Sequence, residues 1–498
     1  MIMQTVENKK ATKKITINPI TRLEGHGKIE IFLDKNGDVE NAYLQIPELR
    51  GFEKFSEDRC AEEMPLITPR ICGVCPLAHH MASTKALDGV FGVEPTTAAK
   101  KLRELMYNAY FFSDHLLHFY YLGGPDFVVG PDAPPADRNI IGVINKVGLE
   151  IGSEVIKHRK YGQEILKMMG GKSVHPACGV PGGISKGLTE EERDTIIKYG
   201  KSAVSFAQFT IDTFNKIVLG NNNYLDLIKS PAYTMKTYYM GLVDDNNKVN
   251  FYDGKIRVVD QDGKEFVKFD PKDYLEHIEE HVEEWTHTKF PFLKKIGWKG
   301  LATGKESGIY RVAPLGRLNA SDGMNTPLAQ KEYEKYFDTL GGKPVHHTLA
   351  MHWARIIELL NAAERFLQLA EDKDITSDDI RNNPTKVSGE GVGVVEAARG
   401  VLIHHYKTDD KGVMKKANLI VATGNNYPAI CISIRDAAKG LIKGGKVTDS
   451  LLNMVEMAFR AYDPCMACAT HTLPGSMPME VEIKDIDGKV VDILSRNI

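Results

Sequence analysis

The chain has 498 residues, 42% of them hydrophobic and 26% charged, which is the composition of a globular protein with a large core. Its formal net charge of −3 argues against a general nucleic-acid binder. No apolar run approaches the roughly 18 residues that a membrane-spanning helix needs, and the polar, lysine-rich start lacks the apolar stretch of a secretory signal.

The first part of the chain is predicted to be β-structure. Residues 14–47 contain a β-rich run at 28–33, a hairpin turn at Asn36-Gly37 and a returning strand at 39–46. The motif R-L-E-G-H at residues 22–26 leads into the first of these strands.

Long helices follow, as the spacing of the apolar residues indicates. They are expected at residues 77–91, 96–122, 140–169, 190–219 and 348–370. The last four lie far apart in sequence, which suggests a central helical bundle whose core carries the functional site.

The rest of the chain contains smaller elements. Residues 222–344 are expected to be a peripheral α+β excursion, 392–422 return to strands, 450–462 form a last helix, and 480–494 alternate like a hairpin. The predicted fold class is therefore α+β and mainly α, with a central bundle of long helices and small peripheral sheets. We expect residues 1–471 to form one large domain.

Two cysteine pairs stand almost the full length of the chain apart. Cys72 and Cys75 lie in R-I-C-G-V-C, and Cys465 and Cys468 lie in D-P-C-M-A-C. Each C-x-x-C places two thiolates within reach of one metal, and four sulfur ligands suit zinc, nickel or an iron–sulfur cluster. A zinc ribbon usually has its pairs within roughly 15–20 residues of each other. The far larger separation here favours a metal at the centre of the fold, where the two ends of the chain meet.

The other three cysteines, Cys60, Cys178 and Cys431, are isolated and are expected to be buried apolar residues. Such sparse use of cysteine is consistent with a reducing cytoplasm. An iron–sulfur cluster usually needs four cysteines of its own. Once the pairs are assigned, any electrons must leave through another polypeptide.

At its cysteine pairs the sequence resembles the large, catalytic subunit of nickel–iron hydrogenases. The motifs at 22–26 and R-G-F-E at 50–53 also match that family, in the same order, and the likeness runs from about residue 18 to 471. The resemblance implies reversible cleavage of dihydrogen into protons and electrons. All four cysteines would bind nickel, and Cys75 and Cys468 would also bridge to an iron that carries carbonyl and cyanide ligands.

The resemblance also implies roles for residues around the metals. Glu24 would take a proton from Cys465, and Arg399 would point its guanidinium at the open metal position. A lone glutamate or arginine is usually a surface charge, so these roles depend on the family match. A polar layer around the cluster would comprise His79, Asp114, His118, Thr423 and Asp463, with Asp463 orienting Arg399. The spacing of Asp114 and His118 predicts one helix face for both.

A second ion, magnesium or iron, is implied near the end of the matched region. Its ligands would be Glu53, His471 and a backbone carbonyl near Leu419, a set that suits a hard cation. Two positions depart from the family pattern: Ala398 and Ala422 stand where many members have proline.

Of three other interpretations, two remain open. The quinone-site subunit of respiratory complex I shares this fold but lacks the four cysteines, which excludes it here. A structural zinc protein would contain zinc and no nickel. A dihydrogen sensor would have the same site and little turnover.

The partners implied are a maturation protease, which cuts after His471 and removes 472–498, and an iron–sulfur small subunit. Cytoplasmic members of the family pass electrons to a deazaflavin, to a nicotinamide or to a heterodisulfide reductase. The stretch C-G-V-C-P-L-A-H-H and a processed length near 471 look most like the last, viologen-reducing type, which has further electron-transfer subunits.

Overall fold

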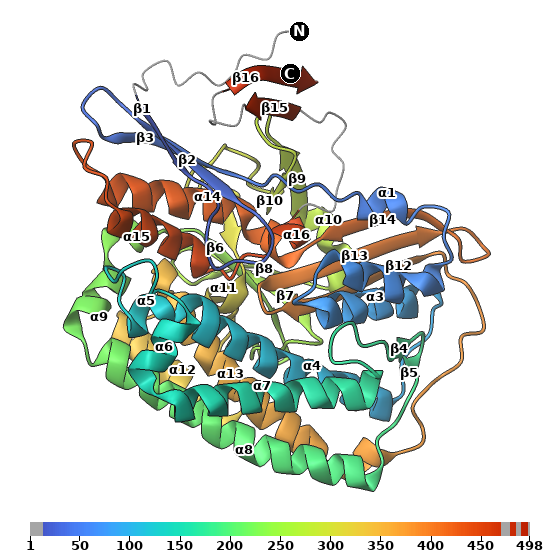
Figure 1. The fold of residues 1–498 in the computed structure, drawn as a ribbon. Coiled ribbons are helices and arrows are strands. Elements are labelled where there is room, and N and C mark those ends of the chain that lie inside the picture. The colour runs from blue at the N-terminus through green and yellow to red at the C-terminus, as the bar shows by residue number, and fades with distance from the viewer. Residues whose placement is uncertain (1–12, 470–478, 485–489, 497–498) are drawn as a thin grey trace.

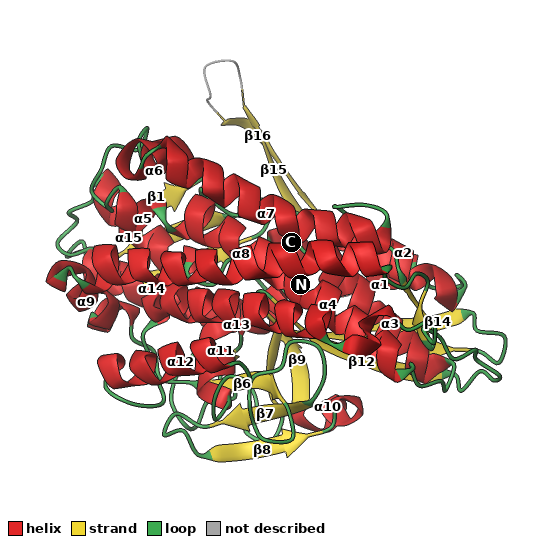
Figure 2. Cartoon of the chain, turned by 90° about the horizontal axis from the view of Figure 1, so that it is seen from below, coloured by secondary structure: helices red, strands yellow, loops and turns green. Residues whose placement is uncertain are grey.

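Four long helices lie side by side in the lower part of the view in Figure 1, and Figure 2 shows them from below. The computed structural model describes residues 13–469, 479–484 and 490–496. The four helices are α4 (Thr97–Leu117), α7 (Leu149–Gly170), α8 (Glu190–Phe214) and α13 (Met351–Glu371). Helix α13 packs against α4 and α8, and α4 packs against α7. The predicted bundle and the mainly helical α+β class are confirmed.

The ends of these helices differ from the predictions in instructive ways. The run at 140–169 is two helices, α6 (Ile140–Val147) and α7, because Gly148 adopts a φ of 97° that no helix continues through. Helices α4 and α8 pass into single π-helical segments, η3 (His118–Gly123) and η4 (Asn215–Leu219). A π-turn changes the angular position of the side chains that follow it, which spacing alone does not reveal.

Two antiparallel meanders flank the bundle. The first is β1 (Lys13–Ile17), β2 (Lys28–Leu33) and β3 (Val39–Gln45), as predicted. The second is β12 (Glu390–Ala397), β13 (Gly400–Thr408) and β14 (Met414–Ile420). Helix α3 (Pro76–Val90) lies directly on β12. Gly393 permits this approach, because a Cβ there would lie 1.9 Å from the Ala82 carbonyl oxygen.

The stretch at 222–344 is not peripheral throughout, and this expectation is corrected. It contains a four-stranded sheet in the order β11 (Tyr310–Arg311), β6 (Tyr238–Val243), β7 (Lys255–Val259), β8 (Glu265–Phe269). However, every residue of helix α11 (Ala313–Ala320) is buried, and α11 packs on β6 and α13. An eight-residue helix that is buried on all sides has no amphipathic stripe from which to recognise it.

One long helix, α14 (Ala422–Leu441), was not predicted. It packs on β3, on α15 (Asp449–Arg460) and on α16 (Met466–Ala469). The predicted last helix corresponds to α15, and the hairpin at 480–494 is confirmed as β15 (Met479–Lys484) paired antiparallel with β16 (Val490–Arg496). The predicted turn Asp487-Gly488 lies outside the described residues.

The remaining elements are short. They are α1 (Phe52–Phe55), η1 (Ala61–Glu63), α2 (Met64–Ile67), η2 (Thr68–Ile71), α5 (Pro125–Val128), β4 (Gly179–Val180), β5 (Gly183–Ile184), α9 (Asn222–Lys229), η5 (Pro231–Tyr233), η6 (Pro271–Asp273), α10 (Tyr274–His277), β9 (Ile278–Val282), β10 (Lys289–Leu293), α12 (Pro327–Leu340), η7 (Thr348–Ala350) and η8 (Lys373–Thr376). Among the described residues, no helix is both long and apolar enough to cross a membrane.

Of the three isolated cysteines, Cys178 and Cys431 are buried as expected. Cys60 is exposed, which corrects that prediction. Its backbone forms an isolated antiparallel bridge with Val413, so the chain there runs along the surface of the second meander.

Candidate active site

The two cysteine pairs meet in the interior. Cys72 Sγ lies 3.3 Å from Cys465 Sγ, and Cys75 Sγ lies 3.5 Å from Cys468 Sγ. All four sulfur atoms lie within 4.8 Å of one another, and all four side chains are buried free thiols. Four sulfurs this close without a disulfide form a ready donor set for a soft or borderline metal.

The local fold explains how each pair reaches this point. Cys72 is the extended residue that ends η2, and Cys75 is the residue that precedes α3. The backbone amides of Val74 and Cys75 donate to Cys72 Sγ at 3.3 and 3.2 Å. Cys465 forms a parallel β-bridge with Glu24, which joins the second pair to the R-L-E-G-H motif.

Glu24 touches the cluster. The thiol of Cys465 donates to Glu24 Oε2 at 2.8 Å, and the Met466 amide donates to the Glu24 carbonyl at 2.9 Å. Burial raises the pKa of Glu24 above its usual value, and a negative charge on Cys72 raises it further. A carboxyl group with a raised pKa beside a thiol is suited to accept and release protons near neutral pH.

The cysteine side chains are electrostatically unlike one another. Burial would raise the pKa of Cys72, but hydrogen bonds from the other three thiols and the charge of Arg399 lower it well below its usual value. Burial raises the pKa of Cys465 and of Cys468. The protein therefore favours a first thiolate at Cys72, and a bound cation would be needed to hold all four in the ionised form.

Arg399 is buried between two aspartates. It donates to both Asp114 oxygens at 3.1 and 3.3 Å, and its Nη2 lies 2.9 Å from Asp463 Oδ2. The pairing with Asp463 agrees with the sequence prediction, whereas the pairing with Asp114 was not foreseen. Burial opposes the charge, but Asp114 and Asp463 raise the pKa of Arg399 well above its usual value, so this arginine stays charged.

Thr423 reaches the second pair through its hydroxyl. Thr423 Oγ1 accepts the backbone N–H of Cys465 at 3.1 Å. Thr423 stands in the first turn of α14, so this unpredicted helix positions Cys465.

His79 lies beside the first and second pairs and belongs to a buried chain of polar groups. Its Nε2 lies 3.6 Å from Cys468 Sγ, and its Nδ1 lies 3.1 Å from His404 Nε2. His404 Nδ1 in turn lies 2.7 Å from the hydroxyl of Tyr406, which donates to Ser83 Oγ. The sequence did not identify His404 and Tyr406. They stand two positions apart on β13, so they fit the ordinary two-residue alternation of a strand and give no sign of a function.

His118 lies one helical turn after Asp114, as their spacing predicted, and its backbone N–H donates to the Asp114 carbonyl oxygen. It is the first residue of the π-helical η3, and its Nε2 lies 2.9 Å from the Arg460 carbonyl oxygen. Its ring stacks on that of His352. His118 therefore holds the end of α15, three residues before Asp463, rather than the sulfur cluster itself.

The residues expected at a second ion are partly brought together. Glu53 Oε1 accepts the backbone N–H of Leu419 at 2.7 Å, and Lys289 Nζ lies 3.8 Å from Glu53 Oε2. Burial raises the pKa of Glu53. This contact uses the amide of Leu419, whereas the carbonyl near Leu419 was expected as a ligand of the ion, and His471 lies outside the described residues.

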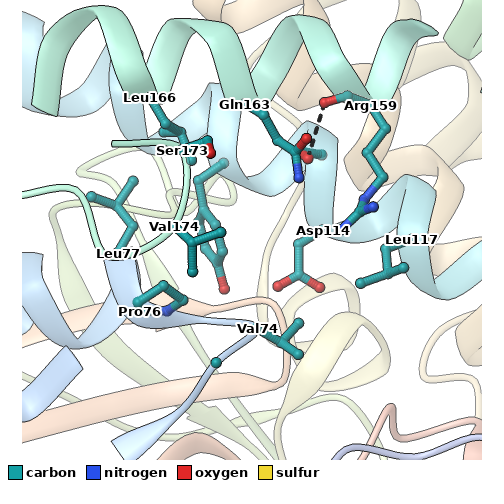
Figure 3. Close-up of a pocket in the computed structure, with 13 residues that line it drawn as sticks. Val74, Pro76, Leu77, Asp114, Leu117, Arg159, Gln163, Leu166, Ser173 and Val174 are labelled. Carbon is teal, nitrogen blue, oxygen red and sulfur yellow. Dashed lines mark hydrogen bonds between the residues drawn. The ribbon is translucent and has the colours of Figure 1, made fainter. Parts of the chain in front are cut away.

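A small cavity of about 90 Å³ lies beside the first pair (Figure 3). It is lined by Gly73, Val74, Pro76, Leu77, Tyr110, Ser113, Asp114, Leu117, Arg159, Gln163, Leu166, Ser173 and Val174. These residues come from the cysteine loop, from α3, α4 and α7, and from the segment after α7. The cavity thus borders the loop between Cys72 and Cys75 and the Asp114 carboxylate, which holds Arg399.

These surroundings fit a nickel–iron centre. Four soft thiol ligands are present in two pairs, one carboxyl group contacts a ligand, and the permanent charge of Arg399 is near enough to lower the pKa of Cys72. A purely structural zinc site would need the four sulfurs alone.

Comparison with known proteins gives the same result. The family described as nickel-dependent hydrogenase matches residues 50–146 and 153–471, and a HoxL-like family matches 14–49. An F420-non-reducing hydrogenase iron-sulfur subunit of Archaeoglobus profundus is 50% identical over 480 residues, which cover 96% of this chain and 99% of that protein. A vhu subunit of the F420-non-reducing hydrogenase of Methanocaldococcus jannaschii is 48% identical, with 86% of this chain and 100% of that protein covered.

Solved structures agree with the sequence relatives. An NAD+-reducing [NiFe]-hydrogenase in the H2-reduced state is 36% identical and superposes with a TM-score of 0.86, covering 93% of this chain and all of that chain. The Ni-Fe-Se hydrogenase of D. vulgaris Hildenborough is 26% identical, with a TM-score of 0.71 and 92% of this chain covered. The chain therefore belongs to the nickel-dependent hydrogenase family, as a large, catalytic subunit.

Proposed function

We propose that this chain catalyses the reversible cleavage of dihydrogen into two protons and two electrons, with Cys465 and Glu24 as the groups that carry the proton. The observation that carries this proposal is the 2.8 Å contact between Cys465 Sγ and Glu24 Oε2 inside a cluster of four thiols. Dihydrogen is apolar and very weakly acidic, so its heterolysis needs a Lewis acid and a base held close together in a dry site.

The four cysteines would hold the metals. Cys72 and Cys465 would bind nickel alone, and Cys75 and Cys468 would also bridge to an iron that carries carbonyl and cyanide ligands. When bound, this centre supplies the Lewis-acid and redox chemistry of the reaction.

The chain's own residues supply the proton path. Cys465 Sγ takes up a proton, and Glu24 accepts it at Oε2, since no rearrangement is needed across 2.8 Å. The raised pKa of Glu24 brings its proton affinity closer to that of a thiol, which makes transfer in both directions feasible.

Arg399 would provide a fixed positive charge beside the open metal position. Its guanidinium is held by Asp114 and Asp463 and is buried with them. The positive charge is therefore preorganised and does not have to reorient during the reaction. Thr423 and His79 would orient Cys465 and Cys468 through their contacts with the Cys465 amide and the Cys468 sulfur.

Hydrogen–deuterium exchange by the purified enzyme tests this function. We expect exchange activity in proportion to bound nickel. A matched variant, Cys465→Ser, should lose nickel and exchange together, because an alkoxide is a much harder ligand than a thiolate. Exchange that persists in nickel-free protein would contradict the proposal.

Electrons would pass to an iron–sulfur small subunit, since the described cysteines beyond the cluster are isolated. The relatives are named as subunits of F420-non-reducing hydrogenases, which supports the viologen-reducing type. The proposed complex would be cytoplasmic and would have further electron-transfer subunits of the heterodisulfide reductase type. Affinity purification under anaerobic conditions should recover an iron–sulfur subunit in equal amount. Recovery of an active, fully reducing monomer would contradict this part of the proposal.

We further propose a second ion site and the removal of the tail during maturation. Glu53, His471 and the backbone near Leu419 would bind magnesium or iron. A protease would cut after His471, so that residues 1–471 remain as one catalytic domain and 472–498 are lost. The end of the family match at residue 471 supports this cut. Cutting would free the segment after Cys468 to close over the loaded metal.

A further inference from the structure

We propose that Arg317, on the buried helix α11, is a positioning residue for Arg399. Its guanidinium holds the backbone that directly precedes Arg399 and so fixes the direction in which the Arg399 side chain leaves the chain. This inference rests on the role proposed above for Arg399.

All five N–H groups of the Arg317 guanidinium are used. Nε donates to Glu358 Oε1 at 2.6 Å, and Nη2 donates to Glu358 Oε2 at 2.7 Å. Nη1 donates to Glu396 Oε2 at 2.7 Å. The last two N–H groups donate to the carbonyl oxygens of Ala397, at 2.8 Å, and Ala398, at 3.0 Å. An arginine has no further donors, so the group is saturated.

The two carbonyl contacts fix the peptide planes immediately before Arg399. On the far side of this residue, Asn426 Nδ2 donates to the Arg399 carbonyl oxygen at 3.1 Å. Alanine at 398 leaves φ unrestrained, unlike proline, so the backbone direction there depends on these hydrogen bonds. The Arg399 side chain leaves a chain that is held from both ends, and it then meets Asp114 and Asp463.

The charges around Arg317 hold it in one orientation. Arg317, Glu358 and Glu396 have no exposed side-chain surface. The second oxygen of Glu396 accepts the Leu242 amide at 2.7 Å. His115 Nε2 lies 2.9 Å from Glu358 Oε2, and burial lowers the pKa of His115 to about 4, so it adds no positive charge at neutral pH. Arg317 is thus the cation between two carboxylates that are held in place by other contacts. None of these three residues is among those described above in contact with the four cysteines.

Lysine cannot reproduce this arrangement. It keeps the charge but has three donors on one flexible nitrogen, so it cannot bind a carboxylate with two parallel bonds and two carbonyls at once. Arg317→Lys should therefore keep the ion pairs in part and release the carbonyls of Ala397 and Ala398.

Arg311→Lys is the matched control. Arg311 is also fully buried, on β11, and its guanidinium donates to Thr237, Thr348, Tyr239 and two backbone carbonyls. None of these partners belongs to residues 396–399. If R317K acts only by removing the hydrogen bonds of a buried guanidinium and so lowering stability, R311K should show the same loss of stability.

The test is a double-mutant cycle with Arg399→Lys on the purified complex. We expect R317K to lower hydrogen–deuterium exchange per bound nickel by between about 10- and 100-fold, as small misplacements of catalytic groups do. In the R399K background R317K should have little further effect, because both changes act through the same guanidinium. R311K should lower the unfolding temperature and leave exchange per nickel near the wild-type value.

One further readout separates the outcomes. A crystal structure of metal-free R317K should show the Arg399 guanidinium displaced from Asp114 or Asp463, and it decides the positioning role even if the wild-type protein proves to have no exchange activity. An equal loss in both backgrounds, an equal loss in R311K, or an unmoved Arg399 overturns the inference. If R317K does not fold, Glu396→Gln, which leaves the Glu358 pair in place, is subject to the same outcomes.

Discussion

Replacing Glu24 by glutamine isolates the proposed proton transfer from the architecture of the site. The side chain keeps its size, and the glutamine oxygen can still accept the Cys465 thiol that lies 2.8 Å from Glu24 Oε2. What is lost is the ability to bind a proton. We therefore expect the metal content and the unfolding temperature to change little, since a near-isosteric change at a half-buried position usually costs roughly 1 kcal/mol or less.

The expected loss of rate follows from the contact geometry. A positioned acid–base group contributes about 10²- to 10⁴-fold. Among the hydrogen bonds of the described residues, Glu24 is the only carboxylate that contacts Cys465. The loss should therefore lie in the upper part of that range, about 10³-fold or more, which corresponds to a barrier higher by about 4 kcal/mol.

Hydrogen–deuterium exchange per bound nickel is the direct assay, with infrared spectra of the iron ligands as the check that the centre is intact. Glu48→Gln is the control, because Glu48 is a neighbouring carboxylate that binds His26 at 2.6 Å and contacts no thiol among the described residues. We expect E48Q to behave as wild type. Unchanged exchange in E24Q with full nickel content would refute the proton path through Glu24.

Other predictions address pH, stability and maturation. Glu24 must be ionised to accept a proton, and burial raises its pKa, so dihydrogen oxidation should fall at low pH with an apparent pKa above 4.5, a limb that E24Q lacks. Burial raises the pKa of Glu396 to about 7, so its contribution to stability is fully present below about pH 4.5 and is lost as the pH rises through about 7. That loss is on the order of 3 kcal/mol, and the unfolding temperature of the metal-free protein should fall less over this window in E396Q than in wild type. Leu105 is wholly buried in α4, so Leu105→Ala should cost about 2–5 kcal/mol in a denaturant titration, while the exposed Leu149→Ala should cost almost nothing. Mass spectrometry of active enzyme should find a chain that ends at His471, and an intact C-terminus in fully active protein would exclude the cut.

The long helices and the cysteine cluster could be predicted because their signals are local. Amphipathic spacing marks α4, α8 and α13, and the C-x-x-C motifs mark the ligands wherever the chain places them. The same logic failed for α14 and α11. Helix α11 is buried on all sides and has no polar face. Helix α14 has Gly424, Asn425 and Asn426 near its start and contains Pro428, residues that favour turns and interrupt a helical pattern.

The surroundings of the cluster were less predictable because they depend on partners distant in sequence. Arg317 meets Glu358 and Glu396, which lie 41 and 79 positions further along the chain. His404 meets His79 across 325 positions. A single histidine or arginine gives no sign of such a partner, whereas the spacing of Asp114 and His118 within one helix correctly placed them one turn apart.

Metal analysis of the mature protein combined with infrared spectroscopy tests the central proposal most directly. Four buried thiols from two distant pairs, with Glu24 in contact with Cys465 and the charge of Arg399 nearby, predict nickel and iron together, with infrared bands from carbonyl and cyanide bound to the iron. Active protein that contains zinc in place of nickel, or that shows no such bands, would contradict the assignment of this site to dihydrogen cleavage.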